Sequence, residues 1–225
     1  MQSTCEVPDP PALLGNPSVV GDGTPQSCTA EALQSAVSGG GDVSFDCGAQ
    51  PVVIAVASQI QIDADTIIDG GGLVTLDGGG ASRLLSVDNH VSLTVIGLSF
   101  SKGFATTTGN DQQSGGAIRG GWSGAVAVFD CRFVDNSAGD EGEEGGGAIY
   151  VPSQSTLLIV ASDFESNRGS TGGAVNNLLS GLTIVNSTFT DNESDLGGGA
   201  VYTDGASGET NDGIGGVIDI CGCRF

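Results

Sequence analysis

The chain has 225 residues, of which 39 are glycine and seven are proline, and 38% of it is hydrophobic. This composition suits a chain with a sizeable core and argues against a disordered or collagen-like protein. Twenty-seven acidic residues against six basic ones give a net charge of −21. Such a surface argues against nucleic acid as a partner and makes divalent cations, above all calcium, the natural counter-ions. No apolar run is long enough for a transmembrane segment.

The first 47 residues of the chain hold three of the six cysteines. The sequence 29–40 predicts a short helix over about 30–37, with Thr29 as its N-cap and glycines as its stop signal. We expect a disulfide between Cys28 and Cys47 that clips this helix onto the first strand, which indicates an oxidising compartment. Two interpretations of Cys5 stay open: a disulfide with another cysteine, or the anchoring cysteine of a lipoprotein.

Further along, residues 60–89 alternate apolar and polar side chains between glycine-rich corners. We interpret them as the first coils of a stacked strand structure. The expected organisation is therefore an N-terminal segment and cap over residues 1–49, followed by repeats over residues 50–225. Met1 leads straight into polar residues, which suggests a processed or recombinant mature segment.

A repeat of five eight-residue segments runs through the rest of the chain. The first, third and eighth positions are apolar in all five, the second and seventh are mostly polar, and the sixth is mostly small. This is strand alternation with a bend near the middle. The final phenylalanines are 33, 31, 25 and 36 residues apart, so the repeat has about 25 residues plus loop insertions. The segments are LTVIGLSF (93–100), VAVFDCRF (126–133), LLIVASDF (157–164), LTIVNSTF (182–189) and IDICGCRF (218–225).

Strand-rich units this short must stack to bury their apolar faces, and they are too short for propeller blades. The sequence therefore predicts an all-β fold, a single-stranded right-handed parallel β-helix with a short N-terminal capping helix. Equivalent residues then form columns, with Phe100, Phe133, Phe164 and Phe189 stacked inside and Asn136, Asn167 and Asn192 laddered at a corner. Cys131 and Cys223 share the inward sixth position, but three coils or roughly 14 Å apart, so they should not pair.

Paired motifs carry a family resemblance. Gly-Gly-Ala-Ile or Gly-Gly-Ala-Val occurs at 115–118, 146–149, 172–175 and 198–201, and three of these copies are followed by Phe-x-x-Asn. The pair resembles the repeats of the chlamydial-type polymorphic outer-membrane proteins. The front part, from Cys28 to about residue 80, resembles the start of bacterial extracellular β-helix proteins of the pectate-lyase-like superfamily. The resemblance implies an adhesin that is extracellular or on the outer-membrane surface of a bacterium, after signal-peptide removal.

One column of side chains is a candidate binding surface. It consists of the residue that follows each Gly-Gly-Ala-Ile or Gly-Gly-Ala-Val motif: Arg119, Tyr150, Asn176 and Tyr202. If the preceding residue points inward, these point outward, and Trp122 lies near the first of them. Aromatic rings among polar donors suit an extracellular glycan or a host or neighbour-cell surface protein. The alternative is that exposed tyrosines simply suit a strand.

Other charged residues give weaker signals. The acidic loop at 139–146 offers four calcium candidates: Asp140, Glu141, Glu143 and Glu144. Their spacing fits neither an EF-hand nor a calcium-binding nonapeptide repeat, so a solvated turn is favoured. The lone His90 is best interpreted as a surface turn residue. The chain stops within a repeat unit, which suggests a truncated array or end-to-end association through the C-terminal coil.

Two function classes remain. The favoured one is a non-catalytic extracellular module that acts in adhesion or in glycan or partner binding, without a cofactor unless calcium binds. The alternative is a polysaccharide lyase or glycoside hydrolase, since the superfamily supports both chemistries. Its best catalytic candidates are Arg132 and Asp163, which fall at the seventh position of neighbouring coils. We expect them to form a plain surface ion pair.

Overall fold

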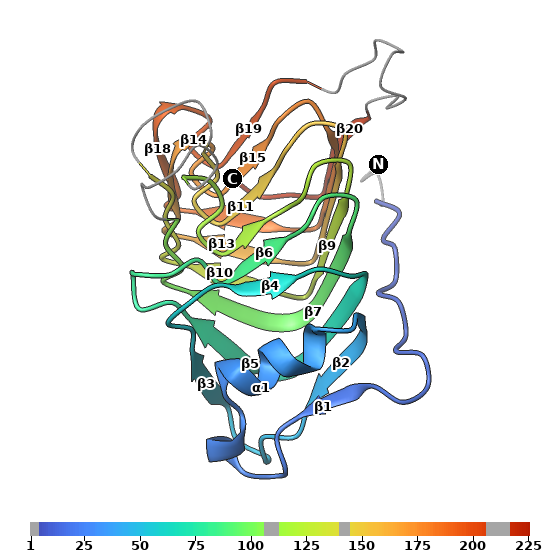
Figure 1. The fold of residues 1–225 in the computed structure, drawn as a ribbon. Helices are drawn as coiled ribbons and strands as arrows, with labels where there is room; N and C mark the ends of the chain where they lie inside the picture. The colour runs from blue at the N-terminus through green and yellow to red at the C-terminus, as the bar shows by residue number, and fades with distance from the viewer. Residues whose placement is uncertain (1–4, 106–112, 140–144, 206–216) are drawn as a thin grey trace.

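Parallel strands stack in register along the whole molecule, from the helix at one end to β20 at the other (Figure 1). The computed structural model describes residues 5–105, 113–139, 145–205 and 217–225. Every strand pair in this part of the chain is parallel, as the register of each pair shows. The fold is a parallel β-helix with one short α-helix near the N-terminus, as the sequence predicts.

The strands of the described residues form three sheets: a large sheet of twelve strands, a second sheet of six and a small sheet of two. The large sheet follows the path β1 (Ser18–Val20), β2 (Gly41–Phe45), β5 (Thr66–Asp77), β7 (Ser92–Ser101), β9 (Ala125–Phe129), β12 (Thr156–Val160), β16 (Gly181–Val185), β20 (Ile218–Cys221), with β3 (Val52–Ala55), β10 (Arg132–Val134), β13 (Asp163–Glu165) and β17 (Thr188–Thr190) beside it. The second sheet contains β4 (Ile60–Ile62), β6 (Leu85–Val87), β8 (Ile118–Arg119), β11 (Ile149–Val151), β15 (Val175–Asn177) and β19 (Val201–Thr203). The small sheet pairs β14 (Arg168–Thr171) with β18 (Glu193–Gly197).

The register of the large sheet reproduces the sequence alignment residue by residue. Position one pairs across neighbouring coils in all five segments. At position eight the rings of Phe100, Phe133, Phe164 and Phe189 stack with centroids 4.6–4.7 Å apart, and Phe225 continues the stack at 5.0 Å. Phe164 is 1% exposed. The predicted phenylalanine column is confirmed.

The bend near the middle of each segment is also confirmed, and it has a backbone cause. The fifth position adopts a left-handed conformation in every copy, with φ between 48° and 69°. A single left-handed residue redirects the chain and separates, for example, β9 from β10 and β12 from β13. The five residues are Gly97, Asp130, Ala161, Asn186 and Gly222.

The asparagines form the predicted ladder at a second corner. The side-chain oxygen of Asn167 accepts hydrogen bonds from both the backbone nitrogen and Nδ2 of Asn136, each at 3.0 Å. Asn192 does the same for Asn167 in the next coil. Each Nδ2 also donates to the carbonyl of a column phenylalanine, as Asn167 does to Phe133 at 3.0 Å. The ladder therefore satisfies buried backbone groups at a corner where no strand pairs them.

The first glycine of each Gly-Gly pair occupies a corner that admits no side chain. Gly172 has φ +66°, and a Cβ there would lie 2.0 Å from the carbonyl oxygen of Val175. Gly146 is equivalent, with φ +76° and 2.2 Å to the carbonyl oxygen of Ile149. Both the positive φ and the close approach require glycine, which explains why the motif recurs in the four successive coils that carry it.

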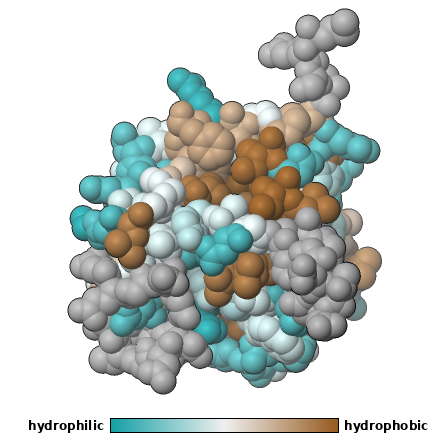
Figure 2. Space-filling view, turned by 90° about the horizontal axis from the view of Figure 1, so that it is seen from above, coloured by the Kyte–Doolittle hydropathy of each residue, from teal (hydrophilic) through white to brown (hydrophobic). Residues whose placement is uncertain are grey.

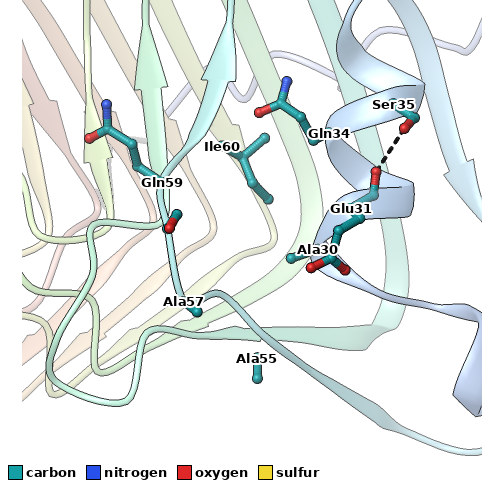
Figure 3. A pocket seen from close by; sticks show the side chains of 9 residues that line it. Ala30, Glu31, Gln34, Ser35, Ala55, Ala57, Gln59 and Ile60 are labelled. Carbon is teal, nitrogen blue, oxygen red and sulfur yellow. Dashed lines mark hydrogen bonds between the residues drawn. The ribbon is translucent and has the colours of Figure 1, made fainter.

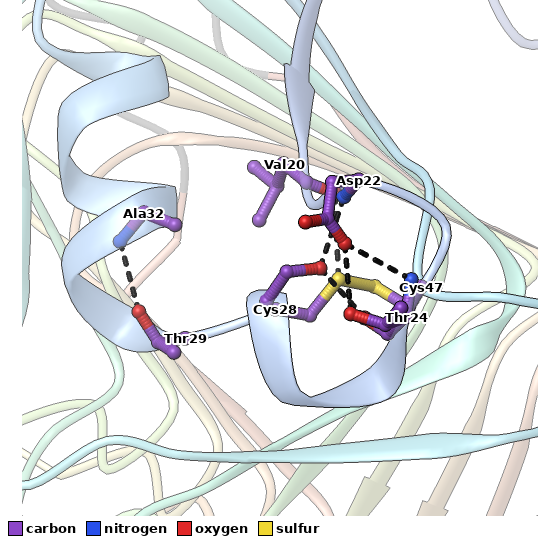
Figure 4. Close-up of a disulfide and its surroundings, with 8 residues drawn as sticks. Val20, Asp22, Thr24, Cys28, Thr29, Ala32 and Cys47 are labelled. Atoms are coloured by element: carbon purple, nitrogen blue, oxygen red, sulfur yellow. Dashed lines mark hydrogen bonds between the residues drawn. A yellow bond between two sulfur atoms is a disulfide. The ribbon is translucent and has the colours of Figure 1, made fainter.

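The N-terminal cap follows the sequence prediction. Helix α1 (Ala30–Val37) begins after Thr29, whose hydroxyl accepts a hydrogen bond from the backbone nitrogen of Ala32 at 3.2 Å. A 3₁₀ turn, η1 (Pro25–Ser27), precedes it. Figure 4 shows the disulfide between Cys28 and Cys47, which joins this turn to the chain after β2, as expected. Strands β1 and β2, upstream of residue 50, already belong to the large sheet.

A second disulfide settles the question of Cys5, which pairs with Cys221 across a sequence separation of 216 residues. A thiol that forms a disulfide cannot carry a lipid anchor, so the lipoprotein interpretation does not hold. In Figure 1 the N-terminal segment runs outside the stack from β1 towards β20. The backbone nitrogen of Leu14 donates to the Asp42 carboxylate at the lower end of this segment. We call residues 5–17 the N-terminal strap.

An apolar column faces the side where the strap is attached. Cys221 occupies the same register position as Phe129, Val160 and Val185. These three lie outside the inner core cluster, yet each is only 3% exposed. Because Cys221 at this position bonds to Cys5, we infer that the strap covers the column.

The remaining two cysteines, Cys131 and Cys223, are free thiols, as expected from their separation along the stack. Burial raises the pKa of the Cys131 thiol to about 12, whereas Cys223 is only partly buried. We therefore expect iodoacetamide to label Cys223 but not Cys131 in the folded protein, and both in urea, because the thiolate is the reactive form. Peptide mapping without reductant measures this. A bond between the two residues, or equal labelling in the folded state, would contradict the register.

Candidate functional site

The candidate binding column has the predicted register. Arg119, Tyr150, Asn176 and Tyr202 pair in that order across β8, β11, β15 and β19. Their exposure differs from the expectation of an open surface. Tyr150 is 3% exposed and Asn176 is 1% exposed, while Arg119 and Tyr202 are partly exposed. The expectation that all four side chains face solvent is therefore wrong for the two middle members.

The chain before the glycine corner at Gly172 contacts the Asn176 side chain. Asn176 donates through Nδ2 to the hydroxyl of Thr171, the last residue of β14, at 2.7 Å. One coil further, a Cβ on Gly197 at the end of β18 would lie 3.8 Å from the Tyr202 ring. The small β14–β18 sheet thus packs against the outer face of the column. The repeat alignment did not reveal this layer, because the residues that form it differ between coils.

Trp122 is 42% exposed to solvent, at the corner that follows β8. The backbone nitrogen of Trp122 donates to Oδ1 of Asn89 at 2.9 Å. The ring of His90 contacts the indole edge-on, with centroids 5.1 Å apart. His90 itself has φ 64° and is exposed, which confirms it as a surface turn residue. We call Trp122, His90 and Asn89 the tryptophan corner.

The weak catalytic pair is adjacent, as predicted, but bonds differently. Arg132 and Asp163 are register partners on β10 and β13. The ion pair of Arg132 is with Glu165, two residues further along β13, at 2.5 Å. Arg132 and Glu165 have side chains 55% and 46% exposed, so this is a surface contact of little energetic weight. The expected Arg132–Asp163 ion pair is corrected to Arg132–Glu165, because a long side chain reaches the diagonal neighbour on the same face.

Arg83 is a charged residue that sequence reasoning missed. It is 4% exposed, and burial lowers the pKa of its guanidinium to about 10, with a further contribution from the charge of Arg119. Its Nε and Nη2 donate to the carbonyls of Gly115 and Ser114, each at 3.0 Å. Arg83 therefore links the second sheet to the glycine corner of the next coil, a role that no local pattern signals.

The described ranges contain neither a metal-binding cluster nor a membrane-spanning helix. Among those residues no group of three or more His, Cys, Asp and Glu side chains could hold a metal ion. The calcium candidates Asp140, Glu141, Glu143 and Glu144 lie outside the described residues. In the same part of the chain, no helix has the length and apolar character of a membrane crossing.

The upper end of the stack is rich in apolar side chains. Figure 2 shows them gathered on this face, which is seen from above. Val217, Ile218, Ile220 and Phe225 are 62%, 42%, 43% and 65% exposed. A terminal coil also presents unpaired backbone groups at its sheet edges. End-to-end association through this coil stays a prediction.

Comparison with known proteins agrees with the repeat seen in the structure. The model of the Chlamydia polymorphic membrane protein repeat matches residues 186–204, which comprise β17, β18 and β19. No curated protein and no solved structure that was compared matches the chain. The two disulfides fit a location outside the cytoplasm. The chain is thus a parallel β-helix repeat protein, one segment of which is similar to the Chlamydia polymorphic membrane protein repeat.

Proposed function

We propose that this protein is a secreted or cell-surface module that binds a glycan or a surface protein of a host or neighbouring cell, without catalysis. The supporting observation is the tryptophan corner, where Trp122 is exposed while hydrogen bonds hold its backbone and the His90 ring contacts its indole. A ring that is already held in place loses little conformational entropy on binding. Aromatic rings also provide large amphipathic contact area.

The proposed surface joins this corner to the accessible ends of the neighbouring column. Arg119 precedes Trp122 by three residues and is partly exposed. Tyr202 lies three register steps away, roughly 14 Å along the stack. A partner that spans several coils could contact both ends while Tyr150 and Asn176 support the strands beneath.

Charge narrows the class of partner. The chain has a net charge of −21, so polyanions such as uronate polymers would approach against a repulsive field. Neutral glycans and basic protein surfaces meet no such barrier. The match to a repeat of a chlamydial membrane protein agrees with a surface role outside a bacterial cell.

We expect the double change Trp122→Ala and Tyr202→Ala to reduce retention on a glycan array or on fixed cells at least tenfold, with little change in melting temperature. Tyr150 is unsuitable for this test, because a side chain that is 3% exposed supports the fold. Leu73→Ala is the matched control, since Leu73 is 40% exposed on another face. Unchanged retention by the double variant would contradict the proposed surface.

The alternative, a polysaccharide lyase or glycoside hydrolase, is tested in the same samples. Reducing-end and unsaturated-uronate assays with a polysaccharide panel, with calcium and with chelator, detect either chemistry. Among the described residues, it is supported by the adjacency of Arg132 with Asp163 and Glu165 on an exposed ladder. Product formation that Arg132→Ala abolishes in a folded protein would favour the enzyme.

A further inference from the structure

The upper end of the stack repeats, in an open form, the interface that joins the coils below it (Figure 2). Phe225 is 65% exposed, whereas Phe189 in the coil beneath is 4% exposed. The two rings stack with centroids 5.0 Å apart, so the column covers one face of the Phe225 ring. Ile218 and Ile220 hold positions one and three of the last segment and are 42% and 43% exposed. In the coils below, these positions are buried, so the end has the side-chain pattern of an internal coil interface.

A backbone donor at this end lacks the acceptor that the repeat supplies in the lower coils. The backbone nitrogen of Asp135 donates to the carbonyl of Glu165 in the coil above, at 3.1 Å. Ser166 donates in the same way to the carbonyl of Thr190, at 3.0 Å. Asp191 is the next member of this series, and its backbone nitrogen has no acceptor among the described residues. A strand placed above β17 would supply one.

The asparagine ladder is unfinished at the same place. Nδ2 of Asn167 donates both to the carbonyl of Phe133 and to the side-chain oxygen of Asn192. Nδ2 of Asn192 donates to the carbonyl of Phe164 at 2.9 Å, which is its one acceptor in the described part of the chain. Because an amide nitrogen carries two hydrogens, the second hydrogen of Asn192 can bond to a group in the position of a further asparagine.

A hollow of about 480 Å³ lies beside these groups. It is lined by residues 188–191, on β17 and the turn after it, together with Arg224 and Phe225. Within the described ranges, the last segment pairs with β17 as far as Phe189, whose backbone nitrogen donates to the carbonyl of Arg224 at 2.8 Å. The hollow therefore lies where a further strand would pair with the rest of β17.

The opposite end of the stack is closed to such an addition. Helix α1 packs against β1 and β4, the strands at which the two larger sheets begin. Figure 3 shows Gln34 on α1 beside Ile60 of β4. Gln34 accepts a hydrogen bond from the backbone nitrogen of Gln61 at 2.9 Å and donates to its carbonyl at 3.1 Å. One side chain thus occupies both backbone groups of an edge residue, and the helix covers this end.

We propose that the upper end is a strand-addition site for another polypeptide that carries the Phe-x-x-Asn pattern of this repeat. The added strand runs parallel to β17, its phenylalanine ring covers Phe225, and its asparagine oxygen accepts from Nδ2 of Asn192. Backbone pairing supplies affinity, and the ring and the amide supply specificity, as in other sheet edges that bind peptides. This surface lies apart from the tryptophan corner, and the inference goes beyond the proposed function.

A second copy of this chain is a poorer occupant. Its lower end is covered by α1, so it would have to offer its own upper end. After the two-fold rotation that joins two such ends, the coil of the second copy runs in the opposite sense. The ring column and the asparagine ladder could not both continue across that contact.

The test adds the whole protein to a fluorescein-labelled peptide with the sequence of residues 182–192, LTIVNSTFTDN, and measures fluorescence anisotropy. We expect a dissociation constant of about 0.1 mM, because the peptide must become ordered when it binds. Alanine in place of the peptide's phenylalanine should weaken binding about tenfold, since the stacked ring is lost. Alanine in place of its C-terminal asparagine should weaken binding several-fold. These changes test the contact without altering the protein.

A protein variant places the contact at the upper end. Phe225→Asp puts a charge where the peptide ring would stack, so it should weaken binding about tenfold with unchanged circular dichroism. Val53→Asp is the matched control, because Val53 is 64% exposed on β3, near the covered end of the stack. Trp122→Ala should leave peptide binding unchanged, so the tryptophan corner is tested separately.

Three results would overturn the proposal. The first is that the parent peptide does not bind. The second is that it binds Phe225→Asp and Val53→Asp equally, or no better than its alanine versions bind the unaltered protein. The third comes from analytical ultracentrifugation: a dimer of the protein that Phe225→Asp dissociates would mean that a second copy covers this end.

Discussion

Removing the Cys5–Cys221 disulfide with the double change Cys5→Ser and Cys221→Ser should lower the free energy of unfolding by about 5 kcal/mol. The bond closes a loop with a sequence separation of 216 residues, almost the whole chain. In the chain-entropy model, a cross-link stabilises the fold by restricting the unfolded ensemble, and more so for longer loops. It also ties the strap to the last described coil, so its loss releases the strap from the column of Phe129, Val160 and Val185.

The Cys28–Cys47 disulfide is the internal control. Its sequence separation is 19 residues, for which the same model gives about 3 kcal/mol. Urea unfolding of the two double-serine variants, both without reductant, compares them directly. An equal or larger loss for the Cys28–Cys47 variant would show that loop closure does not govern the contribution of the strap.

The repeat register could be predicted from the sequence because stacking forces equivalent residues into equivalent environments. Each coil that carries a phenylalanine at position eight places it on the ring of the coil below. The asparagine ladder follows from the same translation, since a side chain that bonds to its neighbour must recur at every step. A five-fold alignment therefore contains the sheet register almost in full.

What the alignment could not give are contacts between non-equivalent segments. Asn176 of the column bonds to Thr171 in the chain before a glycine corner, and the partner of Arg132 is a diagonal neighbour. The sequence did contain a signal for the disulfide partner of Cys5. Cys131 and Cys223 take the inward sixth position, whereas Cys221 takes the fourth, on the opposite side of the bend, where an outer segment could reach it.

The candidate site was harder to predict than the fold for the same reason. Arg83 joins Gln59 to the carbonyls of Ser114 and Gly115, which lie at non-equivalent positions of the chain. The periodicity of the sequence does not indicate contacts between such residues. The tryptophan corner was partly accessible to prediction, because Trp122 is the only tryptophan and follows a motif copy, but its contact with His90 depends on the stacking of two corners.

Replacing Phe164 with alanine should cost about 4 kcal/mol of unfolding free energy, from lost burial and the cavity left behind. The ring is 1% exposed and stacks on both neighbours, Phe133 at 4.6 Å and Phe189 at 4.7 Å. Two stacked contacts are lost, each worth about 0.5–1.5 kcal/mol beyond area burial. The neighbouring coils are held apart by their strand ladders, so the cavity cannot collapse.

Phe225→Ala is the matched control within the same stack. Its ring contacts Phe189 at 5.0 Å and the residue is 65% exposed, so the loss should be about 1 kcal/mol or less. Urea unfolding followed by far-UV circular dichroism gives both values under the same conditions. The difference follows from the position of the ring along the column, since both variants delete the same atoms. Equal effects of the two substitutions would mean that the phenylalanine column is not the continuous core on which the repeats are stacked.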